Sequence, residues 1–383
     1  MISYSTVRLG DLIEERVERC PDPQESGYER FIGLEHMDTG RLEVKRFGST
    51  DDVTTSCKIC HAGDMLFGRR NPYLRRAGVV NFDAACSGDI IVFRPKSECI
   101  IPDFIPIVLA SKQFWTFAMK NQGGTMSKRV HFDDFADYIF ELPDLDSQKK
   151  LSELIWSYER LIDCCDQQLL NLDLLIKSRF IEMFGDVLDI PVKLDDLSIR
   201  ITKGTTPTTA GFEFTNEGVN FVKIENITEN GQLLKESFMH VSQECHDTFK
   251  RSQLQKGDVL FSIAGAIGRT AVVDEDILPA NTNQALAIIR LKDNVINTDY
   301  LIQCLHSEYV VKQYRSKKRG AAQLNLSLED ISNLKIPLPE RSLQDKFAAF
   351  VHQVDKSKVN ISSYKTYLES MKYSLINDQR LIP

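Results

Sequence analysis

The chain has 383 residues and a formal net charge of −7, with 42% hydrophobic and 26% charged residues. This composition excludes an intrinsically disordered protein, and the length predicts at least two hydrophobic cores. The acidic balance excludes a protein that binds nucleic acid over its whole surface, because such proteins carry an excess of Lys and Arg.

Nothing in the sequence directs the chain to a membrane or out of the cell. No run of eighteen or more apolar residues occurs, and the first residues lack a basic segment leading into an apolar core. Nine cysteines are scattered without a framework spacing, which favours free thiols in a reducing compartment. We therefore expect a cytoplasmic protein that does not contact membranes.

Taken in chain order, the elements of the first half recur in the second half. The matched pairs are Val7–Leu12 with Val192–Leu197, Phe31–Glu35 with Phe221–Glu225, Gly63–Phe67 with Gly257–Phe261, Asp103–Ile105 with Asp299–Leu301, and Leu142-Pro143 with Leu338-Pro339. After the last pair, Gln148 and Lys150 are matched 196 residues later by Gln344 and Lys346. The period is far longer than the roughly 20 to 50 residues of a solenoid repeat, so the chain contains a duplicated domain.

The matched pieces predict the type of domain. Apolar runs with β-branched residues, such as Asp89–Phe93 and Ala285–Ile289, are bounded by Gly, Pro and Asp and predict strands. The fold class is therefore expected to be α/β (α+β), with two similar mixed domains at residues 1–145 and 187–341.

Two long helical patterns follow the two domains, at residues 146–186 and 342–383. The first has apolar residues at alternating spacings of four and three, namely Leu151, Ile155, Tyr158, Ile162, Cys165, Leu169, Leu172 and Ile176. The second has the same spacing at Phe350, Val354, Ile361, Tyr364, Leu368, Met371 and Leu375, with Ser357 as its one polar position. Both patterns are heptad seams. Two such helices bury their apolar stripes by pairing, parallel or antiparallel, as a coiled coil. Two ordinary core helices, each in its own domain, are the alternative.

Several runs of the chain also resemble the specificity subunits of type I restriction-modification enzymes. These runs are Ile201–Thr208, Phe221–Ile227, Gly257–Gly268, Gly320–Leu328, Pro337–Pro339, and Ser178–Asp186 at the end of the first long helix. The resemblance covers essentially the whole chain. It implies two target recognition domains that each read one part of a split site in double-stranded DNA. It also implies that the helices form a spacer and dock two methyltransferase subunits, with or without a restriction subunit, and that this chain has no catalytic residue and no cofactor.

The first half departs from the family pattern in one place. Glu14-Glu15-Arg16 and Pro21-Asp22-Pro23 stand where the second half has a Gly-Thr-Thr-Pro loop. The position of the DNA-contact loop in the first half is therefore not given by the resemblance.

Candidate DNA contacts lie in local basic clusters and in one threonine-rich loop. The candidates are Arg69, Arg70, Arg75, Arg76, Lys128, Arg129, Lys203, Thr205, Thr206, Thr208, Lys317, Lys318 and Arg319. Further basic residues occur at Lys250-Arg251 and at Lys312 and Arg315. Basic side chains and hydroxyls bind phosphates, and bidentate side chains distinguish base edges. The alternatives are a solvated charged face for each cluster and a turn with internally bonded hydroxyls for the threonines.

The sequence contains weaker signals for other functions. Asn71-Pro72-Tyr73 resembles the Asn-Pro-Pro-Tyr segment of adenine methyltransferases, but it lacks the second proline and no glycine-rich cofactor turn precedes it. Cys57-Lys58-Ile59-Cys60-His61 has the spacing of a c-type haem site, yet nothing directs export, and zinc would need a second ligand pair. The stretch from Gly265 to Gly268 lacks the residues of a phosphate loop and predicts a tight turn. A coiled-coil scaffold that binds only proteins remains open, and no metal site is expected.

Overall fold

The computed structural model describes residues 3–123, 128–185, 191–315 and 325–378. The chain divides into two compact units, Met1–Leu169 with Asn360–Pro383, and Leu170–Val359. Each unit contains one copy of the repeat together with parts of both long helices.

The described first unit contains three sheets. β1 (Tyr4–Arg8) pairs antiparallel with β12 (Ile139–Pro143), and two five-stranded sheets have the orders β3-β7-β10-β4-β6 and β2-β11-β8-β9-β5. Their strands are β2 (Ile13–Arg16), β3 (Arg19–Cys20), β4 (Arg30–Ile32), β5 (Glu43–Val44), β6 (Gly48–Ser49), β7 (Cys57–Cys60), β8 (Met65–Gly68), β9 (Ala77–Val80), β10 (Ala84–Ser87) and β11 (Ile90–Pro95). The β4–β10 and β5–β9 pairs are parallel and their neighbours antiparallel, so the sheets are mixed.

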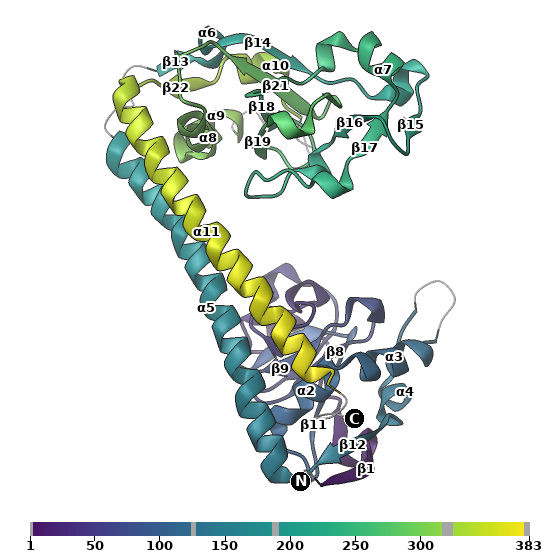
Figure 1. The fold of residues 1–383 in the computed structure, drawn as a ribbon. Helices are drawn as coiled ribbons and strands as arrows, with labels where there is room; N and C mark the ends of the chain where they lie inside the picture. Colours follow the sequence, from purple (N-terminus) through teal and green to yellow (C-terminus); the bar gives the residue numbers. More distant parts are fainter. Residues whose placement is uncertain (1–2, 124–127, 186–190, 316–324, 379–383) are drawn as a thin grey trace. The chain divides into compact units, whose positions relative to one another are not determined.

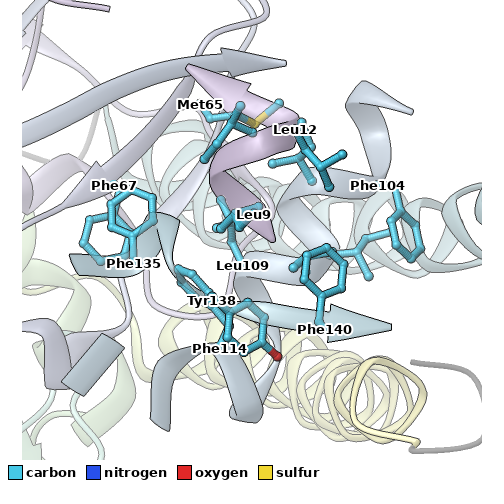
Figure 2. Packing of buried hydrophobic residues seen from close by; sticks show 14 of the residues in the cluster. Leu9, Leu12, Met65, Phe67, Phe104, Leu109, Phe114, Phe135, Tyr138 and Phe140 are labelled. Carbon is cyan, nitrogen blue, oxygen red and sulfur yellow. The ribbon is translucent and has the colours of Figure 1, made fainter. Parts of the chain in front are cut away.

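Short helices cover one face of the β2-β11-β8-β9-β5 sheet, and the other five-stranded sheet packs on its opposite face. They are α1 (Leu9–Leu12), α2 (Ile105–Ala110), α3 (Lys112–Lys120) and α4 (Phe132–Ala136), with 3-10 turns at Pro23–Glu25, Leu34–His36, Thr50–Asp52, Pro72–Leu74 and Pro102–Phe104. Figure 2 shows the core between them, where aromatic residues of β8 and α4 pack together. The ring of Phe67 stacks on Trp115 at 5.1 Å and lies 4.7 Å from Phe135. This core holds β8 rigid where the chain leaves it for the surface.

The second unit repeats this framework. β13 (Pro191–Lys193) pairs with β22 (Lys335–Pro337), and two four-stranded sheets have the orders β14-β21-β18-β19 and β15-β17-β16-β20. Their strands are β14 (Ser198–Lys203), β15 (Phe214–Thr215), β16 (Val219–Val222), β17 (Met239–Val241), β18 (Val259–Ser262), β19 (Thr270–Val272), β20 (Ala280–Thr282) and β21 (Leu286–Leu291). The order β14-β21-β18-β19 matches β2-β11-β8-β9, which confirms the predicted duplication and the mixed α/β class.

The described second unit has five short helices, and all of them except α7 match helices of the first unit. They are α6 (Leu194–Leu197), α7 (Gln243–Thr248), α8 (Thr298–His306), α9 (Glu308–Arg315) and α10 (Leu328–Ser332), with 3-10 turns at Pro207–Ala210, Ile224–Asn226, Lys235–Ser237, Lys250–Ser252 and Glu275–Ile277. Leu328–Ser332 corresponds to Phe132–Ala136, and both begin at a capping box.

Two long helices, α5 (Leu145–Phe184) and α11 (Arg341–Ile376), run side by side (Figure 1). All eight positions of the seam predicted in α5 are buried or half-buried. Residues of α5 pair with residues of α11 in reverse order, so the pairing is antiparallel in each unit. The predicted coiled-coil pairing is confirmed, and its direction, which the sequence left open, is now assigned.

Three lysines at heptad spacing on α11 pair with three acids at heptad spacing on α5. The pairs are Lys358–Asp173, Lys365–Asp166 and Lys372–Glu159, each with a 2.6 Å contact. We call this set the lysine ladder; its first pair lies in the second unit and the other two in the first. The predicted seam of α11 is wrong at Tyr364, which is 50% exposed, whereas Lys372 is buried. The lysine stem packs along the apolar stripe while its ammonium group reaches a carboxylate of α5.

A buried glutamine fixes the start of each long helix to its own domain. In the first unit, the Gln148 amide accepts a hydrogen bond from the Ile101 N–H at 2.9 Å and donates to the Pro143 carbonyl at 2.8 Å. In the second unit, Gln344 accepts from the Asn297 N–H at 2.8 Å and donates to the Pro339 carbonyl at 2.8 Å. The two matched glutamines therefore make the same contacts.

Candidate nucleic-acid interface

In the first half, the loop after β8 joins two basic segments that are distant in the sequence. The Arg69 N–H donates to the Asp89 carbonyl at 3.0 Å, and the Arg69 carbonyl accepts from the Val130 N–H at 3.0 Å. Two residues further, the Asn71 N–H donates to the Lys128 carbonyl at 3.4 Å. The predicted cluster of Arg69, Arg70, Arg75 and Arg76 is thus brought together with Lys128 and Arg129, and we call these six residues the arginine loop.

The backbone of the arginine loop is unusual. Asn71 and Arg75 have φ angles of 54° and 48°, in the left-handed region that non-glycine residues rarely adopt. Between them Pro72 starts a 3-10 turn, and Tyr73 is 66% exposed. Strained backbone of this kind persists where the surrounding structure holds it, and it is concentrated at functional sites. The Asn71-Pro72-Tyr73 segment is therefore a surface turn within the basic cluster.

The electrostatic balance of the arginine loop is positive. Asp89 is the carboxylate that pairs with it in the described part of the chain, at 3.5 Å from Arg70 and 3.6 Å from Arg129. The side chains of these two arginines remain 46% and 43% exposed. Burial lowers the pKa of Lys58; Glu15 opposes the shift, and nearby Arg69 adds to it. A surface of this charge is suited to phosphate groups.

In the second half, the threonine-rich loop after β14 lies close against the chain that follows β20. A Cβ atom on Gly204 would lie 1.9 Å from the Thr282 carbonyl oxygen, so no larger residue fits there without a backbone shift. The next residue, Thr205, donates its N–H to the same carbonyl at 3.0 Å. Pro207 then begins a 3-10 turn that leaves Thr208 exposed.

Part of the threonine loop is bonded internally. The Thr206 hydroxyl donates to the Gln284 side-chain oxygen, and the Thr209 hydroxyl donates to the Thr206 carbonyl at 2.7 Å. Gln284 was not among the predicted contacts, although it ends the polar run Asn281-Thr282-Asn283-Gln284, which begins within β20 and precedes the apolar strand β21. Lys203 is half-buried beside this loop.

The place that holds Arg69–Arg76 in the first half is occupied by Ile263–Gly268 in the second. Gly265 and Gly268 have φ angles of 71° and 93°, and the Gly268 N–H donates to the Ser262 carbonyl at 3.1 Å, so the predicted tight turn is present. The run is followed by Arg269, which matches Arg76 because the Ser262 N–H donates to its carbonyl at 2.9 Å as the Gly68 N–H donates to that of Arg76. The second half therefore has one arginine in this place where the first half has four. The predicted residues Lys317, Lys318 and Arg319 lie outside the described residues.

Three further features bear on the functions weighed from the sequence. All nine cysteines are free, and Cys57 and Cys60 are the buried ends of β7. Within the described ranges, no cluster of three or more His, Cys, Asp or Glu residues is placed to hold a metal ion. Nor do these ranges contain a helix with the length and apolar character needed to cross a membrane.

Comparison with known proteins gives one consistent result. The family model described as the type I restriction modification DNA specificity domain matches residues 2–172 and 191–368. The MjaVIII specificity subunit of a type I restriction enzyme from Methanocaldococcus jannaschii is 20% identical over 406 residues, covering 98% of this chain and 91% of that protein. The EcoBI specificity subunit from Escherichia coli is 29% identical over 140 residues, covering 36% of this chain and 29% of that protein.

Two solved structures share the fold. One chain, from a study of complex assembly and conformational transition in the type I R-M system, has a TM-score of 0.55 at 21% identity and covers 97% of this chain and 96% of its own length. The S subunit of a type I restriction-modification system from M. genitalium has a TM-score of 0.53 at 13% identity, covering 100% of this chain and 96% of that one.

Proposed function

The chain belongs to the type I restriction modification DNA specificity family, and from this premise we propose that each of its halves binds one part of a split site in double-stranded DNA. The observation that carries the proposal is the repetition of one loop framework. In the first half, the Arg69 N–H donates to the Asp89 carbonyl and the Val130 N–H donates to the Arg69 carbonyl. In the second half, the Ile263 N–H donates to the Ala285 carbonyl at 2.8 Å, and the Leu326 N–H donates to the Ile263 carbonyl at 2.9 Å. Two copies of one framework with different loops suit a protein that reads two different sequences.

The two loops contribute in different ways. The arginine loop supplies phosphate contacts, and its exposed guanidinium groups also form bidentate pairs with guanine. In the second half, Gln284 and the threonines supply hydrogen bonds to base edges and phosphates, while Lys203 supplies charge. Lys317, Lys318 and Arg319 belong to this second surface in the proposal.

The long helices dock the methyltransferase subunits and set the spacing between the half-sites. Leu154 and Leu161, one heptad apart on α5, are 43% and 44% exposed in the first unit. In the second unit, Leu175 and Ile181 of the same helix are 46% and 67% exposed. Such apolar faces suit partner helices. The duplication favours two methyltransferase subunits, one for each half, and a restriction subunit joins through them.

Exchange of one half tests the proposal. The variant carries residues 1–145 from another family member and is assembled with the methyltransferase subunits. We expect one half-site of the methylated motif to change and the other to stay, because each half binds DNA through its own loops. The reciprocal exchange of residues 187–341 is the control. A variant that alters both half-sites, or neither, would contradict separate reading.

The chain itself performs no chemistry in this proposal and acts in the cytoplasm beside the DNA. Purified protein incubated with DNA and a labelled methyl donor should incorporate no label, whereas addition of the methyltransferase subunits should restore transfer. Incorporation by the chain alone would assign it the adenine methyltransferase activity instead.

A further inference from the structure

The second unit contains a cavity of about 660 Å³ that is not part of the DNA surface described above. Its walls come from α5, α8 and α11 and from the chain around residues 229–235 and 270–274. This volume lies in the range of ligand sites. Five carboxylates line the cavity, those of Asp173, Glu229, Asp274, Asp299 and Asp355.

The first half fills the corresponding place with one of its own side chains. Gly40 and Gly231 both turn the chain with positive φ angles, 75° and 79°, so Arg41 stands where the second half has Gln232. Arg41 is 16% exposed and lies 3.0 Å from the carboxylate of Glu159. Its guanidinium also contacts Asp163 and Asp166. The loop is thereby fixed to α5.

The long-helix residues around Arg41 and around the cavity show which cations the second half lacks. By the 196-residue repeat that relates Gln148 to Gln344, Glu159 corresponds to Asp355 and Lys372 corresponds to Ile176. Glu159 is 1% exposed because Arg41 and Lys372 both bind it. The side chain of Asp355 is 53% exposed. The second half has therefore kept a carboxylate and lost the two cations that bind its counterpart.

Neighbouring cations neutralise the carboxylates of this cavity only in part. Lys358 lies 2.6 Å from Asp173 and 3.4 Å from Asp355, and Lys235 is drawn to Asp276, which is outside the lining. Lys177 is the third lysine of the lining. Burial raises the pKa of Asp299; His352 opposes this shift and the Asp355 carboxylate adds to it. The cavity therefore has an excess of negative charge.

We propose that this cavity binds the guanidinium group of an arginine presented by a protein partner, in the place that Arg41 occupies in the first half. A guanidinium group matches carboxylates in geometry as well as charge. Leu170 and Leu174 line the cavity and are 53% and 49% exposed, so they offer apolar contacts to residues beside the arginine. The proposal rests on the proposed function only in taking a methyltransferase subunit as the partner.

The first experiment needs no partner. Acetyl-arginine amide is titrated into the full chain and binding is followed through the ring signals of His306, which lines the cavity. We expect saturation with a Kd on the order of 10 mM. Citrulline amide, which has the same shape without the charge, should not bind. Gln232→Arg should weaken binding of the arginine amide at least fivefold, because it fills the cavity from within.

The matched control for this variant is Gln243→Arg on α7, an exposed position outside the cavity lining. It should leave binding of the arginine amide unchanged. Equal binding of the two amides, or equal binding by wild type and Gln232→Arg, would overturn the proposal.

The second experiment tests the partner. Assembly with purified methyltransferase subunits should be at least tenfold weaker for Gln232→Arg than for Gln243→Arg. Equal assembly of the two variants would exclude the methyltransferase subunit as the source of the arginine. Failure of the wild type to assemble would contradict the proposed function, while the amide titration still decides whether the cavity binds a guanidinium group.

Discussion

At matched places after β8 and β18, the first half has a run of arginines held by two left-handed non-glycine residues, and the second half has a turn of glycine, alanine and isoleucine. The two halves also differ along the long helices. Arg41 and Lys372 bind Glu159 in the first half, whereas the matched Asp355 lines a cavity in the second. The backbone bonds that frame both loops are the same. The shared frame thus sets the fold of both halves, which leaves the side chains around it free to differ.

The largest expected difference between the halves concerns Glu159. Glu159→Gln leaves Lys372 buried without its charge partner, so the first unit should lose about 3–5 kcal/mol of unfolding free energy. Asp355→Asn, at the matched half-exposed position, should cost less than about 1 kcal/mol. Urea unfolding followed by tryptophan fluorescence measures the loss for Glu159→Gln in the first unit, which contains both tryptophans, Trp115 and Trp156. Hydrogen exchange of α8 measures the loss for Asp355→Asn in the second unit. Equal losses would show that the buried network adds nothing to the first half.

DNA binding should separate the halves by their salt dependence. Arg70→Ala with Arg129→Ala should reduce the slope of log affinity against log salt by about two, because two phosphate contacts are lost. Lys203→Ala in the second half should reduce it by about one. Fluorescence anisotropy at several salt concentrations measures both slopes. An unchanged slope for the arginine pair would place the arginine loop off the DNA.

Acid sensitivity should be confined to the second half. Burial lowers the pKa of His306, although a backbone contact at Gly268 opposes the shift, and the matched residue of the first half is Ala110. The folded state therefore favours the neutral ring, and stability falls as pH drops through the ordinary histidine pKa of about 6.5. His306→Gln should remove this loss, measured by hydrogen exchange of α8 between pH 7.5 and 5.5. A loss that persists in the variant would assign it to other groups.

The smallest effect is expected in the lysine ladder. Lys365 and Asp166 are 27% and 45% exposed, so reversing one charge with Lys365→Glu should cost only about 0.5–1 kcal/mol. The double variant with Asp166→Lys should recover only part of this loss in the first unit, because the new lysine also lies beside Arg41. A double variant as unstable as the sum of the two single changes would show that the pair does not interact.

The sequence predicted the repeated frame because its elements are short apolar runs in a fixed order. The seam of α5 was also predictable, since its eight apolar positions follow one spacing. The α11 seam was predicted less well: Lys372 is charged and so was not assigned to a buried position, although its partner Glu159 lies on the opposite helix. Gln284 was missed because the polar run that contains it, Asn281–Gln284, is also typical of an ordinary connection before a strand. The domain boundaries at residues 145, 186 and 341, and the roles of the DNA-contact residues, stay predictions.

The lysine ladder has a consequence for how helix length can change. If α11 slipped by one heptad along α5, Lys365 would meet Glu159 and Lys358 would meet Asp166, so two of the three ion pairs would form again. A slip of three or four residues leaves at most one of the three lysines opposite an acid. The lysine ladder therefore favours pairing registers that differ by seven residues, about 10.5 Å of helix. Gln148 and Gln344 determine which of these registers forms, because each fixes the start of its helix. Gain or loss of one heptad in both helices preserves the heptad spacing of the lysines and acids. Related chains can therefore differ in helix length by multiples of seven residues.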